Sequence, residues 1–460
     1  MDLHAPDRSP GMKLLLALIV GAVLTIPLFM VYLLVYDRQS QSETARSSIA
    51  EGWGGPQTLA GPLLVIPYAL QVTETVQENG KPVTRTTAQR RQLFIAPATL
   101  DIDTRINPAR RTRSIYESVV YDADISGSAS FRLPPDAARI VDLATLEFDK
   151  AELRFGVADP RGLKPANRIT IDGQPAPAQP GNGVAATGGS GFFANFDASA
   201  LRERPVTAKF TYALRGHSAV ALAPRAGATR WTVTSPWRHP SYTGGFLPET
   251  RSNTASGFSA TYRISNLALG TTLATTSDSA VESRAPQPTY DSREATTPAV
   301  VAQVGLIQPV DLYAQVNRSV KYGFLFIGFT FMAFLLFDVV AGVRVSAVEY
   351  LLVGAGLVLF FVLLLAFAEV IGFTLAYLVA AGGVIALLTA YSAAVLGSRR
   401  RAGFIAGLLV ALYGVLYILL SLEAYSLLIG SLLLFAALAA VMYLTRNLDW
   451  GGRTVTAPVG

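Results

Sequence analysis

The feature that most constrains the fold of this chain is a set of apolar runs, each long enough to cross a lipid bilayer. A transmembrane helix needs about 20 consecutive, mostly apolar residues. The first run extends from Leu14 to Tyr36, and after a long polar stretch five more follow at residues 322–340, 348–368, 372–396, 403–420 and 425–444. Only 15% of the 460 residues are charged, against about 25% in soluble proteins. We predict a polytopic α-helical membrane protein with six transmembrane helices.

The first run is predicted to stay in the membrane as an anchor. The apolar core of a cleaved signal peptide has about 7 to 15 residues and precedes a small-residue cleavage site. The run Leu14–Tyr36 is longer than this, and no Ala-x-Ala pattern follows it closely. Residues 1–13 and 445–460 are then short N-terminal and C-terminal tails, and residues 322–444 form a five-helix bundle.

The positions of arginine and lysine in the short connections predict the orientation of the chain. Such residues are enriched in cytoplasmic loops. The tails and alternate connections contain Arg8, Lys13, Arg344, Arg399, Arg400, Arg401, Arg446 and Arg453. The two opposing short connections carry Glu369 and Glu423 instead. We predict that both termini are cytoplasmic and that residues 37–321 are exported, into the periplasm of a Gram-negative bacterium whose inner membrane holds the chain.

The exported segment, residues 37–321, is predicted to form a large, β-rich, sandwich-like domain. Apolar and polar residues alternate over residues 100–107, 115–125, 206–214 and 258–264, as is typical of half-buried strands. Asn79-Gly80 and Asp172-Gly173 are hairpin signals, and many short strands with frequent turns favour a sandwich. Two tracts with few large apolar residues, 173–191 and 268–298, are interpreted as mobile loops or linkers.

The composition excludes several kinds of chemical site. The chain has no cysteine and only three histidines, so no disulfide, thiolate nucleophile or cysteine-ligated metal site can form. The histidines do not have a usual zinc-site spacing, and no complete phosphate-binding glycine motif is present. Export excludes nucleic acid as a partner. We therefore predict no catalytic residue, no cofactor and no metal.

The sequence around His217 partly matches a catalytic motif. Gly216-His217-Ser218-Ala219-Val220 resembles a Gly-x-Ser-x-Gly nucleophile elbow until Val220 takes the place of the last glycine. The elbow also needs a strand-to-helix turn, whereas both flanks here resemble strands. We favour a strand end or turn. The alternative, an enzyme acting on cell-wall or lipid material, needs a carboxylate that orients His217 and activates Ser218.

The densest cluster of aromatic, proline and glycine residues in the exported segment extends from Trp237 to Pro248. The pattern favours a packed irregular loop whose histidine bonds a backbone carbonyl. Loops also carry binding sites. If the domain has a partner surface, the candidates for it are Trp237, His239, Tyr242, Phe246 and Leu247.

Charged residues at the ends of the predicted spans are the candidate membrane-face charges. They are Asp338, Arg344, Glu349, Glu369 and Glu423. The first three are expected at the cytoplasmic face, either as a charged cluster or as solvated interface residues, and the other two on the exported side. A transporter would place ionisable groups near the bilayer midplane, where this sequence has none. A transporter or channel accessory protein with a periplasmic gating or substrate-delivery domain is the alternative function.

Ordered motifs occur along nearly the whole chain. They are Gly55-Pro56-Gln57, Gly61–Pro67, His239–Tyr242, Phe246–Pro248, Pro309–Tyr313, Lys321-Tyr322, Thr330–Phe334, Tyr350–Gly354 and Leu444–Trp450. In this order they resemble the CreD family of bacterial inner-membrane cell-envelope proteins. The sequence departs from the family pattern at Arg238, Val370 and Ser346-Ala347, where the family tends to have proline, histidine and His-Pro.

The resemblance implies a protein of envelope integrity or envelope stress, under control of a two-component system and linked to β-lactam response and colicin tolerance. It implies no catalytic residues. We predict a non-enzymatic inner-membrane protein that acts through its periplasmic domain. Its expected partners are the lipid bilayer and either periplasmic or envelope proteins or a cell-wall polymer, and its oligomeric state is left open.

Overall fold

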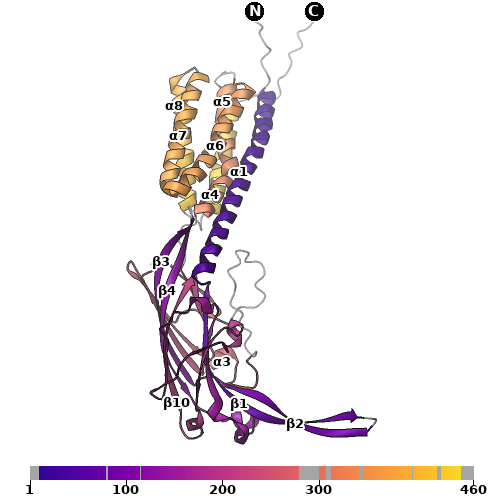
Figure 1. Cartoon of the computed structure of the whole chain (residues 1–460). Coiled ribbons are helices and arrows are strands. Elements are labelled where there is room, and N and C mark those ends of the chain that lie inside the picture. Colours follow the sequence, from indigo (N-terminus) through magenta and orange to yellow (C-terminus); the bar gives the residue numbers. More distant parts are fainter. Residues whose placement is uncertain are drawn as a thin grey trace, which may run out of the picture. The chain divides into compact units, whose positions relative to one another are not determined.

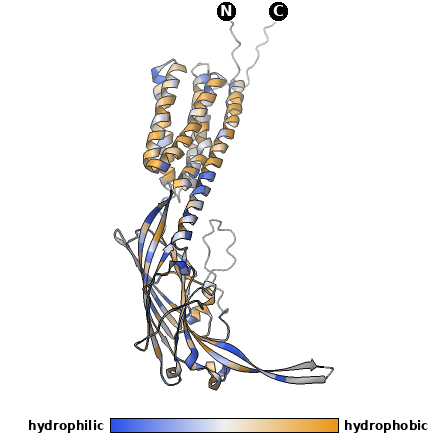
Figure 2. Ribbon diagram, in the orientation of Figure 1, coloured by the Kyte–Doolittle hydropathy of each residue, from blue (hydrophilic) through white to orange (hydrophobic). Residues whose placement is uncertain are grey.

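The computed structural model describes residues 10–78, 81–113, 116–278, 300–306, 312–340, 345–395, 397–421 and 426–446. The chain divides into two compact units. We call Met1–Glu43 with Val310–Gly460 the helical unit, and Thr44–Pro309 the β unit. Figure 1 labels their elements, and Figure 2 shows the mostly apolar helices and the mixed polar and apolar strands.

The helical unit contains long apolar helices. The described helices are α1 (Pro10–Trp53), whose last turns belong to the β unit, α4 (Leu312–Lys321), α5 (Gly323–Val340), α6 (Ala347–Ile371), α7 (Phe373–Val395), α8 (Arg399–Ser421) and α9 (Ser426–Thr445). Five described helices are long and apolar enough to cross a membrane, at Gly11–Trp53, Leu312–Leu336, Ala347–Ile371, Phe373–Val395 and Arg399–Leu420. The sixth predicted span falls on α9, and six crossings remain a prediction.

Glycines allow close helix contacts in the helical unit. A Cβ atom on Gly354 of α6 would lie 2.0 Å from Leu24 Cδ1 of α1, and one on Gly323 would lie 2.8 Å from Leu28 Cδ1. Small residues at such crossings are how membrane helices pack without a hydrophobic driving force. In α8, by contrast, neither Gly403 nor Gly407 has a described neighbour within 4 Å of a Cβ built on it.

The β unit consists of two sheets. Its described strands are β1 (Gln57–Glu78), β2 (Lys81–Ile95), β3 (Thr99–Arg113), β4 (Tyr116–Phe131), β5 (Ala151–Val157), β6 (Arg168–Ile171), β7 (Gln174–Pro175), β8 (Gln179–Pro180), β9 (Gly191–Phe196), β10 (Val206–His217), β11 (Ala219–Ala223), β12 (Ala228–Ser235), β13 (Pro240–Gly244), β14 (Thr250–Thr254), β15 (Gly257–Ser265), β16 (Ala274–Thr275) and β17 (Ala302–Leu306). Two short helices, α2 (Ala137–Ile140) and α3 (Asn266–Leu269), accompany them.

Some strands that are consecutive in the sequence are adjacent in one sheet, whereas others belong to different sheets. The nine-stranded sheet has the order β13-β17-β11-β1-β5-β9-β8, with β2 beside β1 and β16 beside β2. The eight-stranded sheet has the order β14-β15-β12-β3-β4-β10-β6-β7. Most pairs are antiparallel, but β1 with β11 and β3 with β12 are parallel. The sheets are therefore mixed.

The core lies between the two sheets. Phe155 of β5, in the nine-stranded sheet, packs edge-on against Phe210 of β10, in the eight-stranded sheet, with 5.2 Å between ring centroids. Along β3 the residues Leu100, Ile102 and Ile106 are buried. The polar residues between them face outward because side chains alternate along a strand. The alternation that predicted strands over residues 100–107, 206–214 and 258–264 thus corresponds to β3, β10 and β15.

The strands on either side of both predicted hairpin turns pair with each other. Strands β1 and β2 pair from Leu64 with Ile95 out to Glu78 with Lys81, as the long two-stranded ribbon of Figure 1, while the turn Asn79-Gly80 lies outside the described residues. Between β6 and β7, Asp172 has φ +48° and Gly173 φ +84°. Positive φ at both central residues is the type I′ geometry that the Asp-Gly signal predicts.

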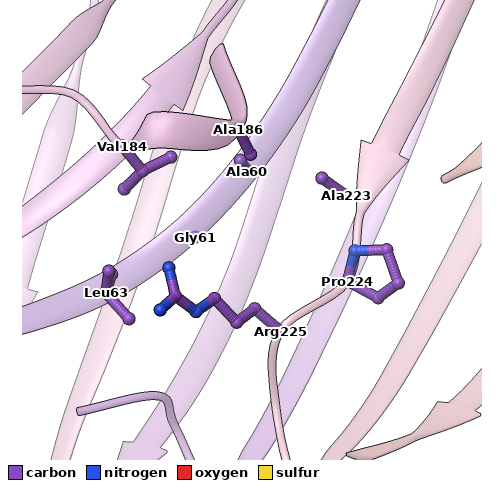
Figure 3. A pocket seen from close by; sticks show the side chains of 8 residues that line it. All are labelled: Ala60, Gly61, Leu63, Val184, Ala186, Ala223, Pro224 and Arg225. Atoms are coloured by element: carbon purple, nitrogen blue, oxygen red, sulfur yellow. The ribbon is translucent and has the colours of Figure 1, made fainter. Parts of the chain in front are cut away.

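In the tract 173–191, predicted to be a mobile loop or linker, Val184 and Ala186 instead pack on the outer face of the nine-stranded sheet. The tract contains β7, β8 and a short 3-10 helix, and Val184 is only 3% exposed. The carboxylate of Asp278 accepts a hydrogen bond from the backbone N of Ala185 and pairs with Arg225. Figure 3 shows Arg225 reaching toward Gly61 in a cavity of about 10 Å³. Such a cavity has room for about one water molecule, so this packing is structural.

Candidate functional sites

Gln57, the first residue of β1, is the centre of a buried hydrogen-bond network in the β unit. Its side chain is 1% exposed. The amide Nε2 donates to the carbonyl oxygens of Asp159, at 3.1 Å, and Arg215, at 3.0 Å, and Oε1 accepts from the backbone N of Asp159 at 3.2 Å. One side chain therefore satisfies three backbone groups and fixes β10 and the segment after β5 to the start of β1.

Glycines make room for this network. A Cβ atom on Gly162 would lie 2.4 Å from the carbonyl oxygen of Arg215, and one on Gly54, which has φ +118°, would lie 2.9 Å from it. The backbone N of Gly55 donates to Asp159 Oδ2 at 3.3 Å. The hydrogen bond from Arg161 lowers the pKa of Asp159. The Gly55-Pro56-Gln57 motif thus has a packing role that its sequence did not reveal.

Trp53, the last residue of α1, contacts two guanidinium groups. The Cζ atoms of Arg111 and Arg215 are each 4.7 Å from its ring centroid, a distance suited to cation–π attraction. Its indole Nε1 donates to the carbonyl oxygen of Tyr121 at 3.4 Å. The sequence carries no signal of this stacking, because Trp53, Arg111 and Arg215 are far apart along the chain.

His217 ends β10, and Ser218, with φ +60°, joins it to β11. The connection is therefore strand to strand, and the strand-to-helix turn of a nucleophile elbow is not present there. His217 Nε2 lies 2.6 Å from Ser118 Oγ, and Nδ1 lies 2.8 Å from Ser218 Oγ. Within the described part of the chain, no carboxylate hydrogen-bonds to His217. Burial, with the positive charge of Arg46 second, lowers the pKa of His217 to about 4.

The five candidate partner-surface residues differ in their exposure. Trp237, Tyr242 and Phe246 are partly buried and pack against the core. Tyr242 lies in the edge strand β13, donates from its hydroxyl to Asn253 Oδ1 at 2.9 Å and meets the ring of Phe258 edge-on. His239 is exposed, and Leu247 is 69% exposed. The predicted irregular loop is thus in part the edge strand β13, and the exposed residues His239 and Leu247 lie before and after that strand.

The candidate charges expected at the cytoplasmic face have separate partners. Asp338 Oδ1 of α5 accepts from Lys13 Nζ of α1 at 2.7 Å. Glu349 forms a capping box with Ser346, in which Ser346 N donates to Glu349 Oε2 at 2.6 Å and Glu349 N donates to Ser346 Oγ at 3.3 Å. Asp338 and Glu349 therefore do not form the expected charged cluster with each other. Arg344 lies outside the described residues.

The candidate charges expected on the exported side are Glu369 and Glu423. Glu369 Oε1 of α6 accepts a hydrogen bond from the hydroxyl of Tyr313 in α4, at 3.1 Å. Glu423 lies outside the described residues. The serine at position 346, where the resembled family tends to have histidine, caps α6 in this chain.

Comparison with known proteins gives matches over nearly the whole sequence. The family described as "Inner membrane protein CreD" matches residues 9–451. The inner membrane protein CreD of Escherichia coli (strain K12) is 32% identical over 441 residues, which cover 94% of this chain and 92% of that relative. Both matches include the helical unit and the β unit.

Proposed function

Because the chain belongs to the CreD family of inner membrane proteins, we propose that it maintains the integrity of the cell envelope and takes part in the envelope-stress response. In this proposal the β unit acts in the periplasm, without catalysing a reaction, by binding an envelope component. The chain crosses the inner membrane six times, and both termini are cytoplasmic.

The observation that carries this proposal is the position of the β unit in the sequence. It is inserted between α1 and the helices that follow from α4 onward, and each flank includes a helix long and apolar enough to span a membrane. A domain tethered at both ends stays at the membrane surface. This suits binding or sensing at the envelope better than action on a freely diffusing substrate.

Two sequence features support six crossings. Helix α9 has 20 residues and no charged side chain, which is enough to span the hydrocarbon core. With six crossings, all the basic short connections fall on the side of the termini, in agreement with the positive-inside rule.

Paired carboxylates in the helical unit favour this function over the transport alternative. A transporter would keep ionisable groups available to a substrate or ion within its helices. From α4 to α9 the described carboxylates are Asp338, Glu349 and Glu369, and each one already accepts a hydrogen bond within the chain.

Complementation of a deletion strain tests the proposed function. The strain receives either the full chain or a variant in which residues 57–306 are replaced by a flexible linker, at equal levels in the membrane. Leakage of a periplasmic enzyme under envelope stress is then measured. We expect only the full chain to restore the barrier. Restoration by the linker variant would contradict action through the β unit.

A further inference from the structure

The outer face of the eight-stranded sheet carries an open groove of about 560 Å³. All of its lining residues except Ala166 come from four adjacent strands, β12, β3, β4 and β10. On the face that points away from the core they are Thr232, Thr234, Asp103, Arg105, Asp124, Ser126, Thr211 and Ala213. None of these residues belongs to the sites described above.

Strand register arranges these side chains in two rows across the sheet. Asp103 pairs with Thr232 on one side and Ser126 on the other, and Ser126 pairs with Thr211. The second row, in the same way, is Thr234, Arg105, Asp124 and Ala213. Because neighbouring strands lie about 4.8 Å apart, each row extends over roughly 14 Å. The groove is therefore an elongated track that runs across the strands.

Side-chain length explains why this part of the face is hollow. The track is floored mainly by hydroxyl, carboxylate and methyl groups on short side chains. Arg230 and Lys209 lie one row beyond it at one end, where Arg230 is paired with Asp101 at 2.6 Å. At the other end, Lys164 pairs with Asp122 at 2.8 Å. Longer charged side chains thus lie beyond both ends of the short-chain floor.

The chemistry of the floor selects among ligands. Hydroxyls both donate and accept hydrogen bonds, carboxylates accept, and guanidinium donates. In the described part of the chain neither the carboxylate of Asp103 nor the guanidinium of Arg105 forms a hydrogen bond or ion pair, so both side chains are available to a ligand. Two carboxylates against one guanidinium oppose a polymer with an anionic group on every unit, and a polar floor offers little to a lipid tail. The ligand that fits this floor is an extended chain rich in hydroxyl and amide groups.

We propose that this groove binds the glycan strand of the cell wall. The inference rests on the proposed function, since only an exported β unit meets that polymer. It names the envelope component that the domain recognises: a chain of sugars whose hydroxyls and amides exchange hydrogen bonds with the two rows of side chains.

A binding assay on the full chain in detergent micelles tests the groove directly. The probe is peptidoglycan glycan strands freed of their stem peptides, with dextran and polygalacturonate as neutral and acidic comparison polymers. Thr211→Arg places a long side chain on the floor. Thr207→Arg is the matched control, because it changes the same residue type on the same strand and face about 13 Å away, outside the groove.

We expect Thr211→Arg to weaken glycan binding at least tenfold and Thr207→Arg to change it less than twofold. Asp103→Asn, which keeps the shape of the floor, should weaken binding about threefold or more, and tryptophan fluorescence checks that all variants are folded. Equal binding by wild type and folded Thr211→Arg, or tighter binding to polygalacturonate, would overturn the proposal.

The two proposals fail separately. If the wild-type chain does not bind the glycan but restores the barrier in the deletion strain, the groove proposal is wrong and the proposed function stands. If it binds the glycan through the groove but deletion leaves the barrier intact, the envelope function is wrong and the binding site stands.

Discussion

Lys13 Nζ and Asp338 Oδ1 lie 2.7 Å apart and join α1 to α5, although the two residues are 325 positions apart in the sequence. The Asp338 side chain is 2% exposed and that of Lys13 20%. Burying a charge without a partner is costly, so each side chain needs the other. The pair therefore fixes the predicted N-terminal anchor to the first helices after the β unit.

Removing one member of this pair should destabilise the helical unit strongly. Lys13→Met leaves Asp338 buried without its partner, and loss of one member of a buried ion pair costs about 3–5 kcal/mol. The double variant Lys13→Met/Asp338→Leu, which removes both charges, should recover much of that loss. Thermal unfolding in detergent micelles measures both. The control is Lys321→Met, at an exposed lysine in α4, and an equal loss of stability there would count against the account.

The network around Gln57 predicts a localised loss of stability in the β unit. Gln57→Ala leaves two carbonyl oxygens and one N–H of the backbone without this partner. A buried polar group left unsatisfied costs about 1–3 kcal/mol. The matched control is Gln71→Ala, at an exposed position of the same strand, which should change stability by less than about 0.5 kcal/mol. Similar denaturant midpoints for the two variants would show that the network contributes little.

His217 predicts that the β unit loses stability in mild acid. Its pKa is about 4 in the folded chain and about 6.5 when unfolded, so between these values the unfolded chain binds a proton that the folded chain does not. The stability contributed by neutral His217 is full above pH 6.5, falls as the pH is lowered and levels off below about 4. This stability contribution is at most about 3 kcal/mol. Solvent screening at the partly exposed imidazole ring makes it smaller.

Urea unfolding of the full chain at pH 7.5 and pH 4.5, followed by tryptophan fluorescence, measures this dependence. His217→Gln keeps a hydrogen-bonding side chain but cannot titrate, so its midpoint should change less with pH than that of the wild type. His239→Gln alters an exposed histidine and should keep the wild-type dependence. If His217→Gln retains the full pH dependence, another group is responsible.

Periodic features of the fold were predictable from the sequence. Apolar runs gave five helices that the structure contains, and period-two alternation gave strands such as β3 and β15, because both patterns reflect which side chains avoid water. The Asp172-Gly173 turn was predictable because few residues adopt positive φ without strain.

Features that depend on distant contacts were not predictable. The partner of Asp338 is at the other end of the chain, and a single sequence carries no sign of such a pairing. The tract 173–191 has few large apolar residues, yet Val184 is buried because the outer face of a sheet supplies the missing surface. The cluster around Trp237 predicted an irregular loop, but its residues 240–244 form strand β13, whose pairing with β17 depends on a distant part of the sequence.

The most direct test is to locate the β unit relative to the membrane by thiol labelling. Because the sequence contains no cysteine, an introduced cysteine is the single thiol in each variant. Leu247→Cys places one exposed thiol in the β unit, and Ser398→Cys places one beside the Arg399–Arg401 connection. Intact spheroplasts are treated with a membrane-impermeant maleimide. The account predicts labelling at position 247 in intact spheroplasts and at position 398 only after lysis. The reverse pattern would place the β unit in the cytoplasm and contradict both the proposed envelope function and the proposed glycan site.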